Sequence, residues 1–149
     1  MIATVPLPKA VMKFSVVIPL YDKAHDITAT IESVLAQAVV NFGAIVVDDG
    51  SSDGGAELVE AITEPRGRLV RQASAGVSGA RNHAISLACD ERVAFLDADD
   101  WHHLSYLATL ANVQNAYPDM HTVAVDFVHF RMPKAYGRRA GRLYKIFPR

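Results

Sequence analysis

Short apolar runs alternate with segments of helical periodicity along most of this 149-residue chain, and this alternation limits the possible folds more than any other feature. The run at 15–20 is nearly all apolar, which is typical of a strand buried on both faces. Apolar residues then recur at helical spacing from Ile27 to Ala38, and Asp26 is placed to cap that helix. Strands that alternate with helices form parallel βαβ units, so the pattern predicts an α/β domain with a mostly parallel sheet.

The same alternation continues toward the C-terminus. Further strands are expected at 44–47, 68–71, 93–96 and 122–130, the last with Val123, Val125, Phe127 and Phe130 turned inward. Helices are expected at 56–62, 76–88 and 104–111, the second of them entered through a loop of small residues. Ligands of parallel α/β sheets bind beyond the carboxyl ends of the strands. The polar clusters that follow three of these strands are therefore the candidate functional residues.

Three carboxylates, those of Asp97, Asp99 and Asp100, follow the predicted strand at 93–96. Carboxylates this close raise one another's pKa unless a positive charge compensates them. Mg²⁺ or Mn²⁺ is a common compensation, because these hard cations take oxygen ligands and share them with phosphates. The alternative is that one of the three caps a helix starting near Trp101 while the others are solvated. The position at a strand end favours the metal.

A second acidic pair, Asp48 and Asp49, follows the predicted strand at 44–47. A carboxylate here can accept hydrogen bonds from a nucleobase or a ribose. Turn formation is the alternative for these residues, and Asp53 is assigned to that role as a turn and N-cap residue. Taken alone, the pair also suits the acidic pocket of a phosphoacceptor receiver domain, although that fold carries its paired acids after the first strand.

Two further segments are candidates for contact with a nucleotide. Pro19 interrupts strand pairing on one side. Tyr21 has a ring that can stack on a base. The alternative for Tyr21 is a half-buried tyrosine of the core. Arg81 lies in the small-residue run Gly76–Asn82. It adds a permanent positive charge beside the amides of a helix N-terminus, which favour anions. The alternative is a loop that carries a surface arginine. The run has neither the Lys-Ser/Thr ending of a P-loop nor a GxGxxG pattern.

Four motifs occur in a fixed order along the chain: FSVVIPLY at 14–21, IVVDDGSSD at 45–53, GVSGARN at 76–82 and FLDADDW at 95–101. Their order and spacing closely resemble the family 2 glycosyltransferases of the GT-A fold, over roughly residues 13–117. The resemblance implies a Rossmann-like three-layer sandwich with a mostly parallel sheet that is incomplete at its C-terminal end. We expect this nucleotide-sugar-binding domain to occupy residues 1–130, followed by a tail at 131–149.

The resemblance also implies a role for each candidate residue. The nucleotide-sugar-binding residues would be Pro19, Tyr21, Asp48, Asp49, Arg81, Asp97 and Asp99. Tyr21 would stack on uracil in a pocket shared with Pro19, and Asp49 would accept hydrogen bonds from the base. Arg81 would lie near the base and the diphosphate. Asp97 and Asp99 match the family's DxD motif, which contacts ribose and metal.

A divalent metal, Mg²⁺ or Mn²⁺, is implied at Asp99 and Asp100. The implied reaction is the inverting transfer of a sugar from a UDP-linked donor to a hydroxyl of a saccharide or lipid-linked saccharide, in bacterial surface polysaccharide synthesis. The metal would stabilise the diphosphate leaving group, and a carboxylate base would take the acceptor's proton. Only Asp119, in a predicted turn, and Asp126 are acidic after the cluster. Neither resembles the family's base, so the catalytic residue is left unassigned.

Family members usually continue well beyond this length and supply the acceptor site there. The alternative to an active glycosyltransferase is therefore a truncated or catalytically silent module, which binds the donor or assembles with a partner but lacks the acceptor half.

Charge is unevenly distributed along the chain. Residues 1–130 hold sixteen acidic and eight basic residues, a net charge of −8, whereas 131–149 hold seven basic residues and no acidic one. An acidic body argues against nucleic acid as a partner. The basic-aromatic tail is typical of segments that contact anionic membranes; the alternatives are a connection that packs against another half or a docking arm in a homo-oligomer. The single cysteine, Cys89, and the lack of a membrane-spanning apolar run fit a cytoplasmic protein, at the inner face of the membrane if the tail binds lipid.

Overall fold

A computed structural model describes residues 12–39, 41–62, 64–124, 127–131 and 140–144, the last two ranges as the course of the backbone alone. Within these residues a four-stranded sheet has the order β3-β2-β1-β4, and every neighbouring pair is parallel. Its strands are β1 (Phe14–Leu20), β2 (Phe42–Asp48), β3 (Gly67–Arg71) and β4 (Arg92–Phe95). The predicted α/β class with a parallel sheet is confirmed.

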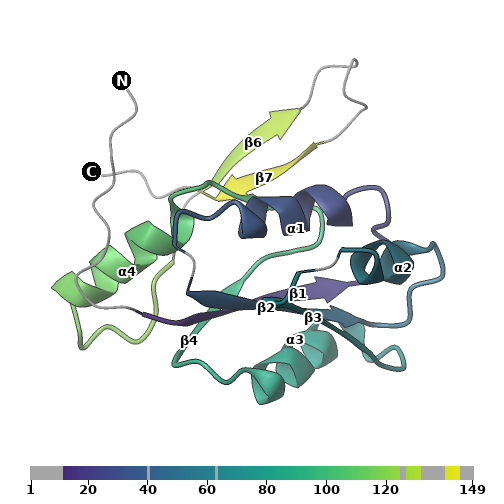
Figure 1. The fold of residues 1–149 in the computed structure, drawn as a ribbon, viewed down its shortest axis with the longest axis horizontal. Coiled ribbons are helices and arrows are strands. Elements are labelled where there is room, and N and C mark those ends of the chain that lie inside the picture. Colours follow the sequence, from purple (N-terminus) through teal and green to yellow (C-terminus); the bar gives the residue numbers. More distant parts are fainter. Residues whose placement is uncertain (1–11, 40, 63, 125–126, 132–139, 145–149) are drawn as a thin grey trace.

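Helices cover both faces of this sheet, which gives the domain three layers. They are α1 (Ile27–Leu35), α2 (Gly55–Glu60), α3 (Gly76–Leu87) and α4 (Tyr106–Ala116). Figure 1 shows α1 and α2 above the sheet and α3 below it. Successive side chains of a strand point to opposite faces, so Val16 and Ile18 of β1 pack with α1 and α4, while Val17 packs with α3. The expected three-layer arrangement is confirmed.

The first helix differs from its prediction at both ends. It ends at Leu35 rather than at Ala38. Asp26 does occupy the N-cap position, but the prediction that its side chain caps the helix is wrong. Its backbone is close to helical (φ −112°, ψ −29°) rather than extended, and its side chain makes no capping hydrogen bond. The Asp26 carbonyl oxygen instead accepts the N–H of Thr30 at 3.1 Å.

The chain after the acidic cluster is extended rather than helical. Trp101–His102 form a short strand, β5, and α4 begins only at Tyr106, so no carboxylate of the cluster caps a helix near Trp101. Both rings of β5 are buried, and the His102 ring stacks on Tyr106 with ring centroids 3.9 Å apart. Burial lowers the pKa of His102 to about 3, so its imidazole is neutral near pH 7. Residues 101–102 thus form a strand paired with β7, and the helix follows it from Tyr106.

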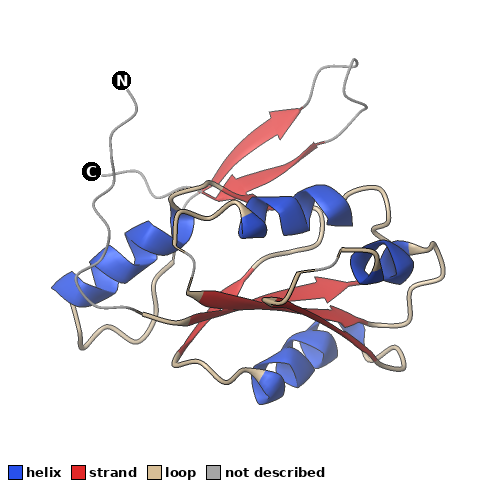
Figure 2. Ribbon diagram, in the orientation of Figure 1, coloured by secondary structure: helices blue, strands red, loops and turns tan. Residues whose placement is uncertain are grey.

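A second, smaller sheet lies beside α1 and has the order β5-β7-β6 (Figure 2). β6 (Phe127–Arg131) and β7 (Ala140–Tyr144) are antiparallel, and β7 is parallel to β5, with Trp101 opposite Leu143. Of the strand predicted at 122–130, residues 127–130 lie in β6, whereas 121–124 has no regular structure. Part of the predicted tail pairs with the segment that follows the acidic cluster.

Several predictions for the C-terminal part fall outside the described residues. The placement of Asp126 and the inward orientation of Val125, Phe127 and Phe130 are among them, as are the side chains of the tail. The domain boundary at residue 130 stays a prediction. None of the helices in the described ranges has the length and apolar character needed to cross a bilayer.

The packing of α4 against the sheet can be tested at Leu107, which is fully buried in the core shared with α1 and β1. Leu107→Ala leaves a cavity, and we expect it to lower the free energy of unfolding by about 2–5 kcal/mol, measured by urea denaturation. Leu58→Ala on the exposed side of α2 is the matched control, with an expected change within about 0.5 kcal/mol. Equal losses in the two variants would contradict this packing.

Candidate functional site

The site begins where two central strands of the sheet stop pairing. β1 pairs with β4 only as far as Val17 opposite Phe95, whereas its pairing with β2 continues through Pro19 to Leu20. Proline has no N–H to donate to a neighbouring strand, so the predicted one-sided interruption at Pro19 is confirmed. From β1 the chain passes to β2 and β3 on one side of β1, and it later returns to form β4 on the other side. Such a switch point is where open parallel sheets hold their ligands.

A cleft of about 600 Å³ lies at this switch point. Six of the predicted nucleotide-sugar-binding residues line it: Pro19, Tyr21, Asp49, Arg81, Asp97 and Asp99. These six come from the ends of β1, β2 and β4 and from α3, so segments far apart in sequence are brought together as predicted. Other lining residues include Lys23, Ser74, Gly76, Val77 and Ala80.

Two predicted residues, Asp48 and Asp100, are not among those that line the cleft. The Asp48 side chain is buried, and its Oδ1 accepts the backbone N–H of Ser51 at 3.0 Å, which is the turn role that was the alternative for this pair. Asp100 is only 2% exposed, and its backbone N–H donates to the carbonyl oxygen of Asp97 in a tight turn. Of the three clustered carboxylates, the structure brings Asp97 and Asp99 to the cleft.

Asp49 is only 3% exposed and both of its carboxylate oxygens are used by the chain itself. Oδ1 accepts from Gln72 Nε2 and from the N–H of Ala75, both at 2.7 Å. Oδ2 accepts from the N–H of Gly76 at 2.8 Å and from Ser74 Oγ at 3.3 Å. Burial alone would raise the pKa of Asp49, but these four donors outweigh it and hold the pKa below its usual value.

These contacts change the interpretation of the small-residue run. The sequence predicts that amides at the start of α3 bind a ligand anion. Two of these amides, those of Ala75 and Gly76, already donate to Asp49. Gly76 has φ +79°, a left-handed conformation that favours glycine, and it lines the cleft. A Cβ on Gly79 would lie 2.7 Å from the Ala75 Cβ, so this second glycine is required by packing within the chain.

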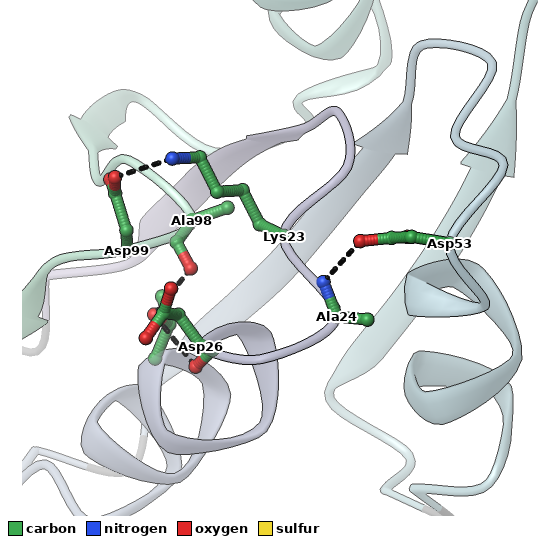
Figure 3. Close-up of polar contacts among 7 residues, drawn as sticks. Lys23, Ala24, Asp26, Asp53, Ala98 and Asp99 are labelled. Atoms are coloured by element: carbon green, nitrogen blue, oxygen red, sulfur yellow. Dashed lines mark hydrogen bonds and ion pairs between the residues drawn. The ribbon is translucent and has the colours of Figure 1, made fainter. Parts of the chain in front are cut away.

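Both cleft carboxylates of the DxD segment (97–99) are paired with protein cations. The Lys23 ammonium lies 2.8 Å from Asp99 Oδ2, and Figure 3 shows this pair. Arg81 Nη2 lies 2.5 Å from Asp97 Oδ1. The hydrogen bond to Asp99 is the main reason that the pKa of Lys23 is raised. The positive charge that the acidic cluster needs is thus supplied in part by Lys23 and Arg81.

The fit of a divalent metal rests on Asp99. In the described part of the chain no three or more His, Cys, Asp or Glu side chains converge as a ligand set. Asp99 nevertheless opens to the cleft and already holds one cation, the Lys23 ammonium. Mg²⁺ is commonly bound by one or two carboxylates together with phosphates of the substrate. The residues therefore fit a metal whose coordination is completed by a diphosphate.

Three residues of the site belong to none of the sequence motifs: Lys23, Gln72 and Ser74. Each follows the end of β1 or β3 by one to three residues. The rule that parallel sheets bind ligands beyond their strand ends would have identified them, had it been applied to basic and neutral side chains as well as to acids.

The sequence matches the family described as "Glycosyl transferase family 2" over residues 15–148. It is 42% identical over 90 residues to the uncharacterized glycosyltransferase YibD of Escherichia coli K12, covering 59% of this chain and 26% of YibD. The Escherichia coli UDP-Glc:alpha-D-GlcNAc-diphosphoundecaprenol beta-1,3-glucosyltransferase WfgD is 40% identical over 87 residues, covering 58% and 34%. The succinoglycan biosynthesis protein ExoO of Rhizobium meliloti is 37% identical over 123 residues, covering 78% and 35%. The chain spans about a quarter to a third of the length of these relatives.

Two solved structures have the same fold. Staphylococcus aureus TarS 1-349 in complex with UDP-GlcNAc has a TM-score of 0.67 at 30% identity, covering 72% of this chain and 32% of that structure. The mannosyltransferase PcManGT from Pyrobaculum calidifontis, in complex with GDP-Man and Mn²⁺, has a TM-score of 0.66 at 28% identity, covering 80% and 36%. The GT-A fold expected from the four motifs is confirmed by these neighbours.

The role of Asp49 in holding the start of α3 can be tested with Asp49→Asn. The variant keeps the shape of the side chain but removes its charge and replaces one acceptor oxygen with an NH2 donor, which then faces donors of the chain. We expect the free energy of unfolding at pH 7 to fall by about 1–3 kcal/mol, measured by urea denaturation. Asp119→Asn, in the exposed turn after α4, should change it by less than about 0.5 kcal/mol.

The stability difference between wild type and Asp49→Asn should also depend on pH, in a direction set by the lowered pKa of Asp49. Because the folded chain holds the pKa of Asp49 below the unfolded value of about 3.9, the charge of Asp49 stabilises the fold above that pH. This stabilisation is lost as the pH falls through the lower folded pKa. The stability difference between wild type and Asp49→Asn should therefore shrink in acid. The pKa of Asp53 is also lowered, chiefly by the Ala24 amide. Because Asp53 is present in both proteins, its contribution cancels in the stability difference. A difference that grows in acid would contradict this role.

Proposed function

The chain belongs to glycosyl transferase family 2, and from that premise we propose that its cleft binds the nucleoside diphosphate of a UDP-linked sugar donor. One observation carries the proposal: at the switch point of the sheet, the two carboxylates of the DxD segment meet two protein cations in a cleft of about 600 Å³. Such a site can exchange its internal ion pairs for contacts with a charged ligand. TarS and PcManGT, which have the same fold, were solved with UDP-GlcNAc and GDP-Man, respectively.

The nucleoside would bind between the end of β1 and the start of α3. Tyr21 is 55% exposed, so its ring face is available to stack on a base without disturbing the core. Asp49 is expected to accept from the base. Its weakest contact, the 3.3 Å bond from Ser74 Oγ, is the one that a base N–H would most readily replace. Asp48 would act beside it by holding the turn through Ser51 rather than by direct contact.

The diphosphate would bind between Arg81 and Lys23. The planar guanidinium of Arg81 suits phosphate oxygens, and the Lys23 ammonium can move on a flexible stem. Asp97 and Asp99 would then be freed for the ribose and for a divalent metal, Mg²⁺ or Mn²⁺. A bound metal would act as a Lewis acid toward the leaving diphosphate. For the buried Asp100 we propose a supporting role through the turn that presents Asp97.

We propose inverting transfer to a hydroxyl acceptor as the reaction. The acceptor oxygen forms a bond to the anomeric carbon while the bond from that carbon to the diphosphate breaks, and a carboxylate takes the acceptor's proton. Asp119 lies exposed in the turn that the sequence predicts, closed by a hydrogen bond from Met120 N–H to the Tyr117 carbonyl oxygen. No role as the base is assigned to it.

The names of the relatives support a lipid-linked saccharide acceptor and a place in bacterial polysaccharide synthesis. WfgD is named for transfer to a diphosphoundecaprenol-linked sugar, and ExoO for succinoglycan biosynthesis. An acceptor of this kind would place the chain at the inner face of a membrane, with the basic tail as its contact.

Donor binding can be tested by thermal unfolding with UDP and Mn²⁺. A ligand at about 100 times its Kd raises the free energy of unfolding by about 2.7 kcal/mol, so we expect UDP to raise the Tm by several degrees in the presence of Mn²⁺. Asp99→Asn removes the carboxylate that would hold the metal and should abolish the part of this increase that depends on Mn²⁺. Asp119→Asn should keep it. No stabilisation by UDP with either Mn²⁺ or Mg²⁺ would refute donor binding.

A panel of UDP- and GDP-sugars separates transfer from silent binding. A catalytically competent site releases the nucleoside diphosphate from one sugar donor, by hydrolysis or transfer, and mass spectrometry detects the product. A module that only binds the donor is stabilised thermally by the nucleotide but releases no nucleoside diphosphate from the sugar donors.

A further inference from the structure

Hydrogen bonds hold the backbone on both sides of the Lys23–Asp99 ion pair, which Figure 3 shows. On the lysine side, the N–H of the next residue, Ala24, donates to Asp53 Oδ2 at 2.7 Å. On the aspartate side, the carbonyl oxygen of the preceding residue, Ala98, accepts the hydroxyl of the buried Thr30 at 2.8 Å. The backbones that carry the two charges are therefore held in place relative to each other.

The loop that carries Lys23 is anchored at a second point. Asp22 has φ +47°, in the left-handed region, and the neighbouring loop after β2 stabilises it there. Asp22 Oδ1 accepts the N–H of Ser52 at 2.8 Å, and the N–H of Asp22 donates to Ser51 Oγ at 3.1 Å. The backbone is thus constrained, while the Lys23 side chain is 43% exposed on a stem with several rotatable bonds. Its ammonium can change partners without a movement of the loop.

We infer that Lys23 is an internal counter-ion of Asp99: its ammonium competes with a free divalent cation for this carboxylate and transfers to the diphosphate when a nucleotide binds. The inference rests on the proposed function and deepens it, because it makes metal binding depend on the nucleotide. Lys23 binds the diphosphate in this scheme and takes no part in bond making or breaking.

The consequence is a positive coupling between metal and nucleotide. In the absence of nucleotide, a cation that binds Asp99 must displace the Lys23 ammonium from Oδ2 or lie beside its like charge, and either weakens binding. With a diphosphate present, the displaced ammonium gains phosphate oxygens instead. Each ligand therefore strengthens the other by the same factor, as thermodynamic linkage requires.

The test is Mn²⁺ binding to the metal-free chain, measured by electron paramagnetic resonance of the unbound ion, with and without UDP. In Lys23→Met, Mn²⁺ binding without nucleotide should tighten by about two- to fivefold, the ratio that an exposed ion pair is worth. UDP binding in the presence of Mn²⁺ should weaken, so the coupling factor falls. A lysine that only supports the fold would not give tighter metal binding when it is removed.

Two matched variants complete the design. Lys23→Arg keeps the charge and should keep weak nucleotide-free Mn²⁺ binding together with strong coupling. Lys13→Met removes an exposed lysine just before β1 and should leave both quantities unchanged. Lys23→Gln repeats the charge removal with a polar side chain, in case the methionine alters the loop.

The outcomes separate this inference from the proposed function. If wild type binds UDP with Mn²⁺ but the two neutral variants show no gain in nucleotide-free Mn²⁺ binding, the counter-ion role is overturned and donor binding stands. If wild type gives no UDP binding under any metal condition, donor binding fails, and the inference fails with it.

Discussion

β1 pairs with β4 only as far as Val17, and the rest of the site depends on this early end of the pairing. Because β1 continues to Leu20 against β2 alone, the chain that leaves β4 turns away over the open side and carries the DxD segment with it. Pro19 helps to keep that side open, since it has no N–H with which to extend the pairing. Residues from the ends of β1 and β4 and from α3 therefore face one another across a cleft rather than packing into the sheet.

Charge balance is the second element of the site. The cleft gathers three carboxylates at the ends of two strands, β2 and β4, and each has partners within the chain: Lys23 for Asp99, Arg81 for Asp97, and four hydrogen-bond donors for Asp49. The Asp49 contacts hold the loop before α3 and are well shielded. The two ion pairs are partly exposed and each contributes little to stability, so they can be exchanged for a charged ligand at small cost. This contrast divides the site into a fixed part and an exchangeable part.

The sequence predicts the sheet, its four βα segments and six of the residues in the cleft, because all of these follow from hydrophobic periodicity and from strand ends. It does not predict which of three neighbouring carboxylates reaches the cleft, since the tight turn at 97–100 and the burial of Asp100 depend on tertiary contacts. The Asp26 cap fails for a similar reason, because a suitable residue type does not determine the backbone conformation. Lys23 lies in no motif, and its role emerges only when β1 and the DxD segment come together.

We propose that the nucleoside diphosphate and its metal replace the internal ion pairs of the cleft. A crystal structure of the chain with UDP and Mn²⁺, with Mn²⁺ located by anomalous scattering, tests it most directly. We expect a metal peak at Asp99, with the Lys23 ammonium moved from Asp99 to a phosphate oxygen. A nucleotide bound outside the cleft, or Lys23 still paired with Asp99 beside a bound diphosphate and metal, would contradict it.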